Sequence, residues 1–298
     1  MRTPKPTLLA FLLPFFLWFF SEPLVVAQSG QRFSFVFMTD VHIKNEPHVL
    51  TSYRRAIDSI NALEPDFVLS GGDQVFDVMR GNVAKSDSLF QLFLSESARI
   101  HAPVHTAVGN HELFGIYEVS PTDHTHPDYK YGMYERYFGA PYYSFSHKGW
   151  HIVVLNNLDV EGYKFFAGID EEQLEWLAHD LAQLPPETPV IMMMHVPIVS
   201  VQNQYRSTGG GAGPSVVNKD RLMALIQQHD VRLVLQGHLH FPEDIYVLNR
   251  TRFITGGAIA GRPSWRGLEN GPRGFLHFQI DGDDLTYRFV AYDTMNAK

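Results

Sequence analysis

Hydrophobic and polar positions along the first third of the chain alternate between two spacings. Residues 33–38, 67–69 and 104–108 are short apolar runs of the kind that forms buried strands. Between these runs, over residues 53–63 and 89–94, apolar side chains recur every three or four positions, which is the spacing of one helix face. The resulting β-α-β-α-β order predicts an α/β protein with a largely parallel sheet.

Strands and helices also alternate in the second half of the chain. Four further apolar runs have the length of strands: residues 143–145, 151–155, 190–194 and 233–235. Residues 222–226 lie on a predicted helix, and the tail from Phe253 onward alternates like antiparallel β structure. Residues 109–141 and 199–215 have no regular spacing, and we expect them to form loops.

One helix of the second half carries its own start and stop signals. Leucines recur at helical spacing between residues 174 and 184, and Pro185 ends the pattern. Asp170 stands where an N-cap is expected, with Gln173 three residues further along, as in a capping box. We therefore predict a helix that begins just after Asp170.

Short polar motifs follow five of the predicted strands. They are Asp40-Val41-His42, Gly71-Gly72-Asp73, Gly109-Asn110-His111-Glu112, His195 and Gly237-His238-Leu239-His240. Ligands of open α/β sheets gather beyond the carboxyl ends of the strands, so five separate loops can deliver these side chains to one crevice. Residues two apart in an extended segment point the same way. By that spacing Asp40 and His42 reach one ion, and His238 and His240 address neighbouring ions.

The chemistry of these motifs is that of a transition-metal site. Carboxylate oxygens together with imidazole nitrogens suit Mn, Fe or Zn better than Ca, which prefers oxygen ligands alone. A carboxylate such as Asp73 can bridge two ions. A single D-x-H or H-x-H motif among 15 histidines would be weak evidence, but five motifs in order at five strand ends predict a metal centre. The glycines fit this reading as turn residues of the loops that present the ligands.

The five motifs resemble the signature of the calcineurin-like metallophosphoesterase family, which runs D-x-H, G-D-x-x-D/N, G-N-H-D/E, a lone His after a strand, and G-H-x-H. They span residues 40–240 in the family order. Purple acid phosphatases of this family have a tyrosine where this chain has Phe76, and they lack the histidine found here at position 42. The chain therefore looks more similar to the branch of the class III cyclic-nucleotide phosphodiesterases and their bacterial relatives.

This resemblance implies a fold and a set of roles. The implied fold is a four-layer α-β-β-α sandwich of two mixed sheets flanked by helices. Two metal ions are implied, Mn, Fe or Zn, with Asp73 bridging them. The implied ligands of one ion are Asp40, His42, Asp73 and His240, and those of the other are Asp73, Asn110, His195 and His238. By the same resemblance, His111 is the catalytic histidine, and Glu112 orients His111 or packs nearby.

The resemblance implies hydrolysis of small phosphomonoesters or phosphodiesters, such as nucleotide-like or sugar phosphates. In the family mechanism, two ions activate a water molecule and hold the phosphoryl oxygens, while His111 stabilises the transition state or protonates the leaving oxygen. The alternative is a catalytically inactive, metal-stabilised binding module on the same fold. Inactive members usually lose ligands or the histidine after Asn, and here both are present, which favours an enzyme.

The N-terminus has the features of a signal peptide. Arg2 and Lys5 precede an apolar run over residues 8–20, and Val25 and Ala27 offer small residues for a cleavage site. We predict a signal peptide over residues 1–27 and a single metallophosphoesterase domain over residues 28–298, exported to the periplasm or the extracellular space. The apolar run is shorter than the roughly 20 residues that cross a bilayer. An uncleaved anchor is the alternative, and no membrane span is predicted after cleavage.

Composition and charge narrow the partners. The chain has no cysteine, which excludes disulfide bonds, so packing and bound metal must hold the fold. Its formal net charge of −8 disfavours nucleic-acid polymers, whereas bound cations would reverse the sign locally and admit a small anionic phosphoester. The pattern assigns no substrate-binding residue and leaves the oligomeric state open. Side chains considered for substrate binding without being assigned that role are His124, His126, Arg262, Arg266, Arg273 and the aromatic residues Tyr117, Tyr129, Tyr131, Tyr134, Tyr137, Phe138, Tyr142 and Tyr143. Asp77 matches the second acidic position of the family's G-D-x-x-D/N motif and is left outside the ligand set.

Overall fold

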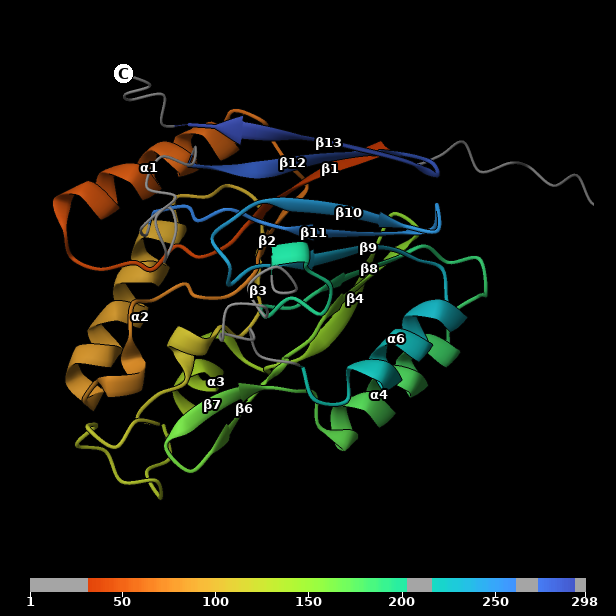
Figure 1. Ribbon diagram of the computed structural model, residues 1–298. Helices are drawn as coiled ribbons and strands as arrows, with labels where there is room; N and C mark the ends of the chain where they lie inside the picture. Colours follow the sequence, from red (N-terminus) through yellow and green to blue (C-terminus); the bar gives the residue numbers. More distant parts are fainter. Residues whose placement is uncertain (1–31, 203–215, 261–272, 293–298) are drawn as a thin grey trace, which may run out of the picture.

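Two mixed β-sheets face each other in the middle of the molecule (Figure 1). The structure is a computed structural model and describes residues 32–202, 216–260 and 273–292. The predicted signal peptide lies outside the described residues, as do Arg262, Arg266 and most of the predicted 199–215 loop. Among the described residues, no helix is long and apolar enough to cross a membrane.

The first sheet has the strand order β13-β12-β1-β2-β3. Its strands are β1 (Arg32–Met38), β2 (Phe67–Ser70), β3 (Val104–Thr106), β12 (Gly274–Asp281) and β13 (Asp284–Ala291). β1, β2 and β3 run parallel, and the helices α1 (Pro47–Asn61) and α2 (Val83–Ser97) connect them. This is the predicted β-α-β-α-β unit. The strands β12 and β13 add an antiparallel pair at one edge, as expected for the tail.

The second sheet has the order β10-β11-β9-β8-β5-β4. Its strands are β4 (Tyr143–His147), β5 (Trp150–Val154), β8 (Val190–Met193), β9 (Val231–Gln236), β10 (Glu243–Val247) and β11 (Thr251–Thr255). The four central strands are parallel, and β4 and β10 pair antiparallel at the two edges. The tail expectation holds on one side of β11 only, because β11 pairs antiparallel with β10 and parallel with β9. The helices α4 (Glu171–Ala182) and α6 (Lys219–Gln228) lie side by side on the outer face (Figure 1).

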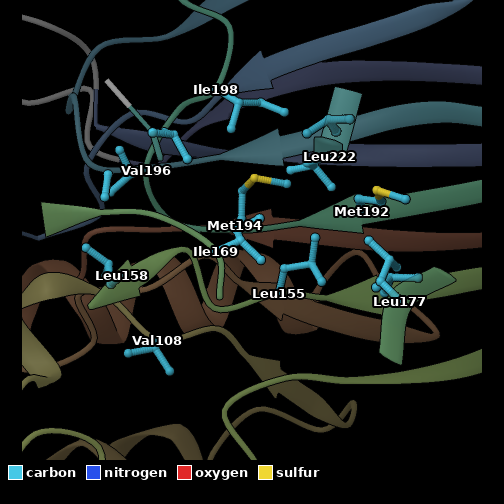
Figure 2. Packing of buried hydrophobic residues seen from close by; sticks show 14 of the residues in the cluster. Val108, Leu155, Leu158, Ile169, Leu177, Met192, Met194, Val196, Ile198 and Leu222 are labelled. Carbon is cyan, nitrogen blue, oxygen red and sulfur yellow. The ribbon is translucent and has the colours of Figure 1, made fainter. Parts of the chain in front are cut away.

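Alternation of apolar side chains along the strands produces four layers. In β8, Ile191 and Met193 point into the core between the sheets, whereas Met192 points to the core under α4 and α6 (Figure 2). Leu177 and Leu222 contribute to that outer core from the two helices. A third core lies between α1, α2 and the first sheet. Three apolar cores separate four layers, so the predicted α-β-β-α sandwich is confirmed.

Only one of the two hydrogen bonds of the expected capping box forms at the start of α4. The Asp170 side chain accepts a hydrogen bond from the backbone N–H of Gln173 at 2.7 Å, so the predicted N-cap is present. The Gln173 side chain does not return to Asp170. Instead it bonds both the N–H and the C=O of Asn156, at 2.9 and 2.7 Å, and so fastens the helix to the segment after β5.

Several short elements had no sequence signal. The segment at 109–141, expected to be a loop, contains a 3-10 turn (Asn110–Glu112) and the helix α3 (Gly132–Phe138). A separate hairpin is formed by β6 (Leu158–Glu161) and β7 (Lys164–Ala167). These elements have only three to seven residues, which is too few to establish a period.

Candidate metal centre

The five polar motifs lie beyond the carboxyl ends of parallel strands from both sheets. Asp40, Asp73 and Asn110 follow β1, β2 and β3 of the first sheet, and the histidine motifs follow β8 and β9 of the second. Hydrogen bonds join the two halves: His195 Nδ1 lies 2.8 Å from the carbonyl oxygen of Gly71, and the N–H of His238 donates to Asp40 at 3.1 Å. The site therefore bridges the two sheets at one end of the sandwich.

The ligand loops do not have the extended backbone that the sequence spacing suggested. Asp40, His42, Asp73, His238 and His240 all have positive φ, between 47° and 68°. This left-handed region is unfavourable for residues other than glycine, and a cluster of such residues is typical of functional sites. In the D-x-H and H-x-H motifs, both members have this left-handed backbone conformation, and that conformation brings their side chains to the site. The expectation that an extended backbone aligns residues two apart was therefore wrong.

Glycines allow the loops to approach one another closely. At Gly109, a Cβ atom would collide with the backbone nitrogen of Asp73, so the loops after β2 and β3 can meet only without a side chain there. Gly72 has φ of +98°, and a Cβ at this position would collide with the ring of His195. Both glycines are therefore required by the packing of the ligand loops.

One group of potential ligands consists of Asp40, His42, Asp73 and His240, all buried. One donor atom from each lies within 4.8 Å of the others, which is close to twice a metal–ligand bond of roughly 2.0–2.3 Å. His240 Nε2 is 3.1 Å from Asp40 Oδ1, and the Nε2 atoms of His42 and His240 are 2.9 Å apart. Two imidazole nitrogens and two carboxylates thus face one small volume.

The second group consists of Asp73, His195 and His238. His195 Nε2 lies 3.3 Å from Asp73 Oδ2, the same oxygen that lies 3.6 Å from His42 Nε2 in the first group. Asn110 presents its Oδ1 to this group, 2.9 Å from His238 Nδ1 and 3.2 Å from His195 Nε2. All seven residues singled out in the sequence as ligands therefore meet in two adjacent groups that share Asp73.

The protonation states of the ligand side chains at neutral pH favour the binding of cations. Burial alone would raise the pKa of Asp40, but the neighbouring His240 lowers it to about 2, and nearby histidines likewise hold the pKa of Asp73 well below its usual range. Burial lowers the pKa of His42 to about 3 and that of His238 to about 4. At neutral pH these imidazoles are uncharged, with a lone pair available to a metal ion.

The pKa of His195 shifts in the opposite direction. Burial would lower its pKa, but the Asp73 carboxylate overrides that effect and raises the pKa to about 9. A proton on His195 then offsets part of the negative charge of the buried carboxylates. The same balance favours a metal cation in this position, and the donor set of buried oxygen and nitrogen atoms fits two such ions.

His111 lies beside the groups rather than within them. Its Nδ1 accepts a hydrogen bond from the backbone N–H of Asp77 at 2.9 Å, so the neutral ring carries its proton on Nε2. His111 Nε2 is 4.0 Å from Asp73 Oδ2. Burial lowers the pKa of His111, which keeps the ring neutral. Asp77, left unassigned in the sequence, thus supplies the backbone contact that orients His111.

One of the two expectations for Glu112 was that it orients His111, and this expectation was wrong. The Glu112 carboxylate is fully buried and accepts three backbone N–H groups, from Asp73 at 2.9 Å, Val75 at 3.0 Å and Gly109 at 2.8 Å. Burial and the charge of Asp73 act to raise the pKa of Glu112, whereas the three N–H donors favour the charged carboxylate. Glu112 therefore fixes the backbone of the Asp73 loop.

Several side chains that were considered for substrate binding form packing contacts or hydrogen bonds within the protein. Tyr134 is fully buried and its hydroxyl donates to the carbonyl oxygen of Thr106, and Tyr137 stacks on Phe90 with ring centroids 5.0 Å apart. His124 stacks on Tyr129, with centroids 4.4 Å apart. These contacts favour packing over substrate binding for most aromatic residues of the 109–141 segment. Arg273 donates to the hydroxyl of Ser52 on α1, at 2.8 Å.

Comparison with known proteins identifies related sequences and folds. Residues 33–242 match the family model described as calcineurin-like phosphoesterase. No curated protein sequence matches the chain. Among solved structures, a dimetal phosphatase from Danio rerio has a TM-score of 0.62 at 17% identity, covering 88% of this chain and 96% of that one. A purple acid phosphatase from yellow lupin (Lupinus luteus) seeds has a TM-score of 0.62 at 17% identity, covering 87% of this chain and 52% of that one.

A further similar structure is GAP50, the anchor in the inner membrane complex of Plasmodium. It has a TM-score of 0.53 at 15% identity, with 89% of this chain and 86% of that chain covered. At such identities the likeness concerns the fold, while the family follows from the match over most of the sequence.

Proposed function

The chain belongs to the calcineurin-like phosphoesterases, a family of metal-dependent enzymes, and from this premise we propose that it is an exported hydrolase of small phosphomonoesters or phosphodiesters. One observation carries the proposal. A single carboxylate oxygen, Asp73 Oδ2, faces His42 of one buried ligand group and His195 of the other, with the neutral ring of His111 alongside. This is the arrangement that two-ion hydrolysis requires.

The seven clustered residues would hold the two ions. When bound, the ions supply the positive charge that activates a water molecule and neutralises the phosphoryl oxygens. His111 is placed to donate a hydrogen bond from Nε2–H to the leaving oxygen and so to stabilise the charge that develops there as the bond from that oxygen to phosphorus breaks. The water oxygen forms the new bond to phosphorus, and the proton that this water loses neutralises the leaving oxygen through solvent. A positioned hydrogen-bond donor of this kind contributes roughly 10² to 10³ in rate.

The donor set also bears on the identity of the ions. Carboxylate oxygen, amide oxygen and imidazole nitrogen together favour Mn, Fe or Zn. Phe76 stands three residues after Asp73 and offers no phenolate, so we propose a centre without a tyrosinate–iron chromophore. An optical spectrum of the iron-loaded protein without a visible charge-transfer band would support this part of the proposal.

The proposed location and substrate size rest on the sequence. Residues 1–27 have the features of a signal peptide, and we propose a single mature domain over residues 28–298 in the periplasm or outside the cell. The negative net charge argues against long polyanions, so a small nucleotide-like or sugar phosphate is the proposed substrate. Mass spectrometry of the exported protein, with Gln28 as its first residue, would establish the cleavage site.

The rival function is a metal-stabilised binding module without catalysis. GAP50, which has a similar fold, is described as an anchor, so the fold alone does not decide between the two functions. The residues favour the enzyme, because Asn110 and His111 are present and the two ligand groups are complete among the described residues.

Hydrolysis of model esters distinguishes these functions. The purified protein is loaded with Mn and assayed with p-nitrophenyl phosphate and bis(p-nitrophenyl) phosphate, before and after chelation. We expect turnover of at least one ester that is lost on chelation and restored by Mn. Bound metal without turnover of either ester would support the binding module, and a panel of natural phosphoesters would then define the substrate of an active protein.

A further inference from the structure

We infer that the leaving group of the substrate carries a planar aromatic ring and that Phe76 binds this ring at the rim of the metal centre. The inference rests on the proposed function, because it assumes that a phosphoryl group lies between the two ligand groups. It adds a class of substrate and a residue that selects it.

Phe76 is a partly exposed residue beside the buried centre. Its side chain is 39% exposed, whereas His42 and His111 next to it are each 3% exposed. The ring centroid of Phe76 is 5.7 Å from that of His111 and 6.3 Å from that of His42. The backbone N–H of Phe76 donates to the carbonyl oxygen of Ile43 at 3.2 Å, which places the ring at the junction of the loops after β1 and β2.

The position of His111 determines which part of the substrate meets this ring. Because the Asp77 N–H donates to His111 Nδ1, the ring presents Nε2–H as its hydrogen-bond donor, and under the proposed function this donor faces the leaving oxygen. The leaving group therefore lies beside His111. Among the described residues, Phe76 has the exposed ring next to His111, so the group attached to the leaving oxygen passes over or against this ring.

A second aromatic ring borders the other ligand group. Phe165 of β7 is partly buried, and its ring centroid lies 6.4 Å from that of His238, in an edge-on orientation. Within the described part of the chain, the His111 ring, which is proposed to face the leaving oxygen, contacts Phe76 and His42, whereas Phe165 contacts His238. Of the two rings, Phe76 is therefore the one placed to meet the leaving group.

Lys44 holds the Phe76 ring in place. The Lys44 ammonium lies 4.4 Å from the centre of the ring, and it also forms an ion pair with Glu46 at 3.2 Å. A ring fixed by such contacts loses little freedom when a ligand binds, which favours affinity. Aromatic side chains of this kind bind planar groups by stacking, with an effect of roughly 5- to 150-fold in affinity per base.

Non-hydrolysable phosphonates test the ring site without requiring turnover. Phenylphosphonate and methylphosphonate share a head group, differ in the aromatic ring, and have a P–C bond in place of the ester bond. Their affinities for the Mn-loaded protein are measured by calorimetry. We expect phenylphosphonate to bind at least 5-fold more tightly, a difference that Phe76→Leu abolishes and Phe76→Trp retains. Methylphosphonate affinity and metal content should be the same in all three proteins.

Tyr246→Leu is the matched control, because Tyr246 is 50% exposed on β10 and contacts Arg252 rather than the metal centre. It should leave both affinities unchanged. Equal binding of the two phosphonates by the wild type would overturn the inference, as would a preference that survives in Phe76→Leu. If no phosphoester is hydrolysed but the Phe76-dependent preference is found, the proposed hydrolase function fails while the ring site stands.

A second pair of ligands distinguishes an aryl group from a nucleoside. AMP and ribose 5-phosphate share phosphate and sugar and differ in the base. A higher kcat/KM for AMP that Phe76→Leu reduces to the value for ribose 5-phosphate would show that the ring reaches a nucleobase. Equal values, with the phenylphosphonate preference intact, would show that the ring contacts a group attached directly to the leaving oxygen. Either result supports the inference. A wild-type protein that prefers neither phenylphosphonate over methylphosphonate nor AMP over ribose 5-phosphate contradicts it.

Discussion

The carboxylate of Glu112 accepts the backbone N–H of Asp73 at 2.9 Å, and this contact fixes the residue shared by both ligand groups. The same carboxylate also accepts the N–H groups of Val75 and Gly109, so a side chain from the loop after β3 organises the loop after β2. Asp73 has φ of +55°, a conformation that requires support from its surroundings. Glu112 provides that support from within the protein core.

Replacing Glu112 by Gln should destabilise the protein even without metal. The side-chain amide offers one acceptor oxygen for three N–H donors, and its NH₂ group must face at least one of them. We expect a loss of about 1–3 kcal/mol in the free energy of unfolding, the cost of leaving a buried donor unsatisfied. Urea titration of the chelated protein measures it.

The exposed Glu172→Gln on α4 serves as the control for this change and should have little effect. A Glu112→Gln protein as stable as the wild type, with unchanged metal content, would show that the three hydrogen bonds do not support the loop.

The strands and the ligand motifs could be predicted from the sequence because both depend on local patterns. Apolar runs of three to six residues indicated strands, and the polar residues after them indicated where a site would form. The sequence did not reveal how the ligands converge, since a positive φ at Asp40 or His240 depends on contacts with other loops. The role of Glu112 was hidden for the same reason, because its partners lie up to 39 residues away.

Tertiary contacts also decided the outcome at Gln173. Its position in a capping box favoured a hydrogen bond to Asp170, yet the buried backbone of Asn156 offered a donor and an acceptor together. Satisfying both buried groups outweighs a second bond at an exposed helix end. Phe76 was visible in the sequence only as a replacement for tyrosine, because exposure at the rim of a site has no local signal.

Removing His111 should lower turnover without removing the metals. The His111 ring lies beside the ligand groups, and its Nδ1 accepts the Asp77 N–H, so His111→Ala removes the Nε2–H hydrogen-bond donor alone. We expect kcat to fall roughly 10²- to 10³-fold with metal content near that of the wild type. His238→Ala should lower metal content as well, because His238 belongs to the second ligand group.

Elemental analysis alongside kinetics separates these two effects, with the exposed His179→Ala on α4 as the control for a histidine-to-alanine change. Equal metal loss in His111→Ala and His238→Ala would contradict the separate roles assigned to the two residues.

Asp66 should stabilise the far end of the sandwich in a pH-dependent way. Its carboxylate contacts Lys148 Nζ at 2.5 Å and His147 Nε2 at 3.1 Å in the turn of the second sheet, and accepts the N–H of Ser34 at 3.0 Å. Although burial acts to raise it, the pKa of Asp66 is lowered by these contacts. A lowered pKa means that the stabilisation is present above the ordinary aspartate value near 3.9 and is lost as the pH falls through the folded value.

Asp66→Asn should therefore cost about 1 kcal/mol at pH 7, a small value because solvent screens this partly exposed site. The difference from the wild type should shrink as the pH falls below about 4. Urea titrations of both proteins at pH 7 and pH 3, after chelation, measure it. A difference that is constant over this range would show that the charge of Asp66 contributes nothing.

Removal of the metals should destabilise the protein, because the buried carboxylates of Asp40 and Asp73 then lose their counterions. The two carboxylates repel each other, and only neighbouring histidines offset that repulsion in the cation-free protein. Ligands that bind only the folded state add about 2.7 kcal/mol at a concentration 100 times Kd, so we expect chelation to lower Tm by roughly 5–10 °C. Differential scanning calorimetry with and without Mn measures the shift.

In Asp73→Asn the added Mn should raise Tm far less, because the shared ligand is lost to both groups. An equal Mn-dependent shift in Asp73→Asn and wild type would place the bound ions away from Asp73, and the two-ion centre described above would then be wrong.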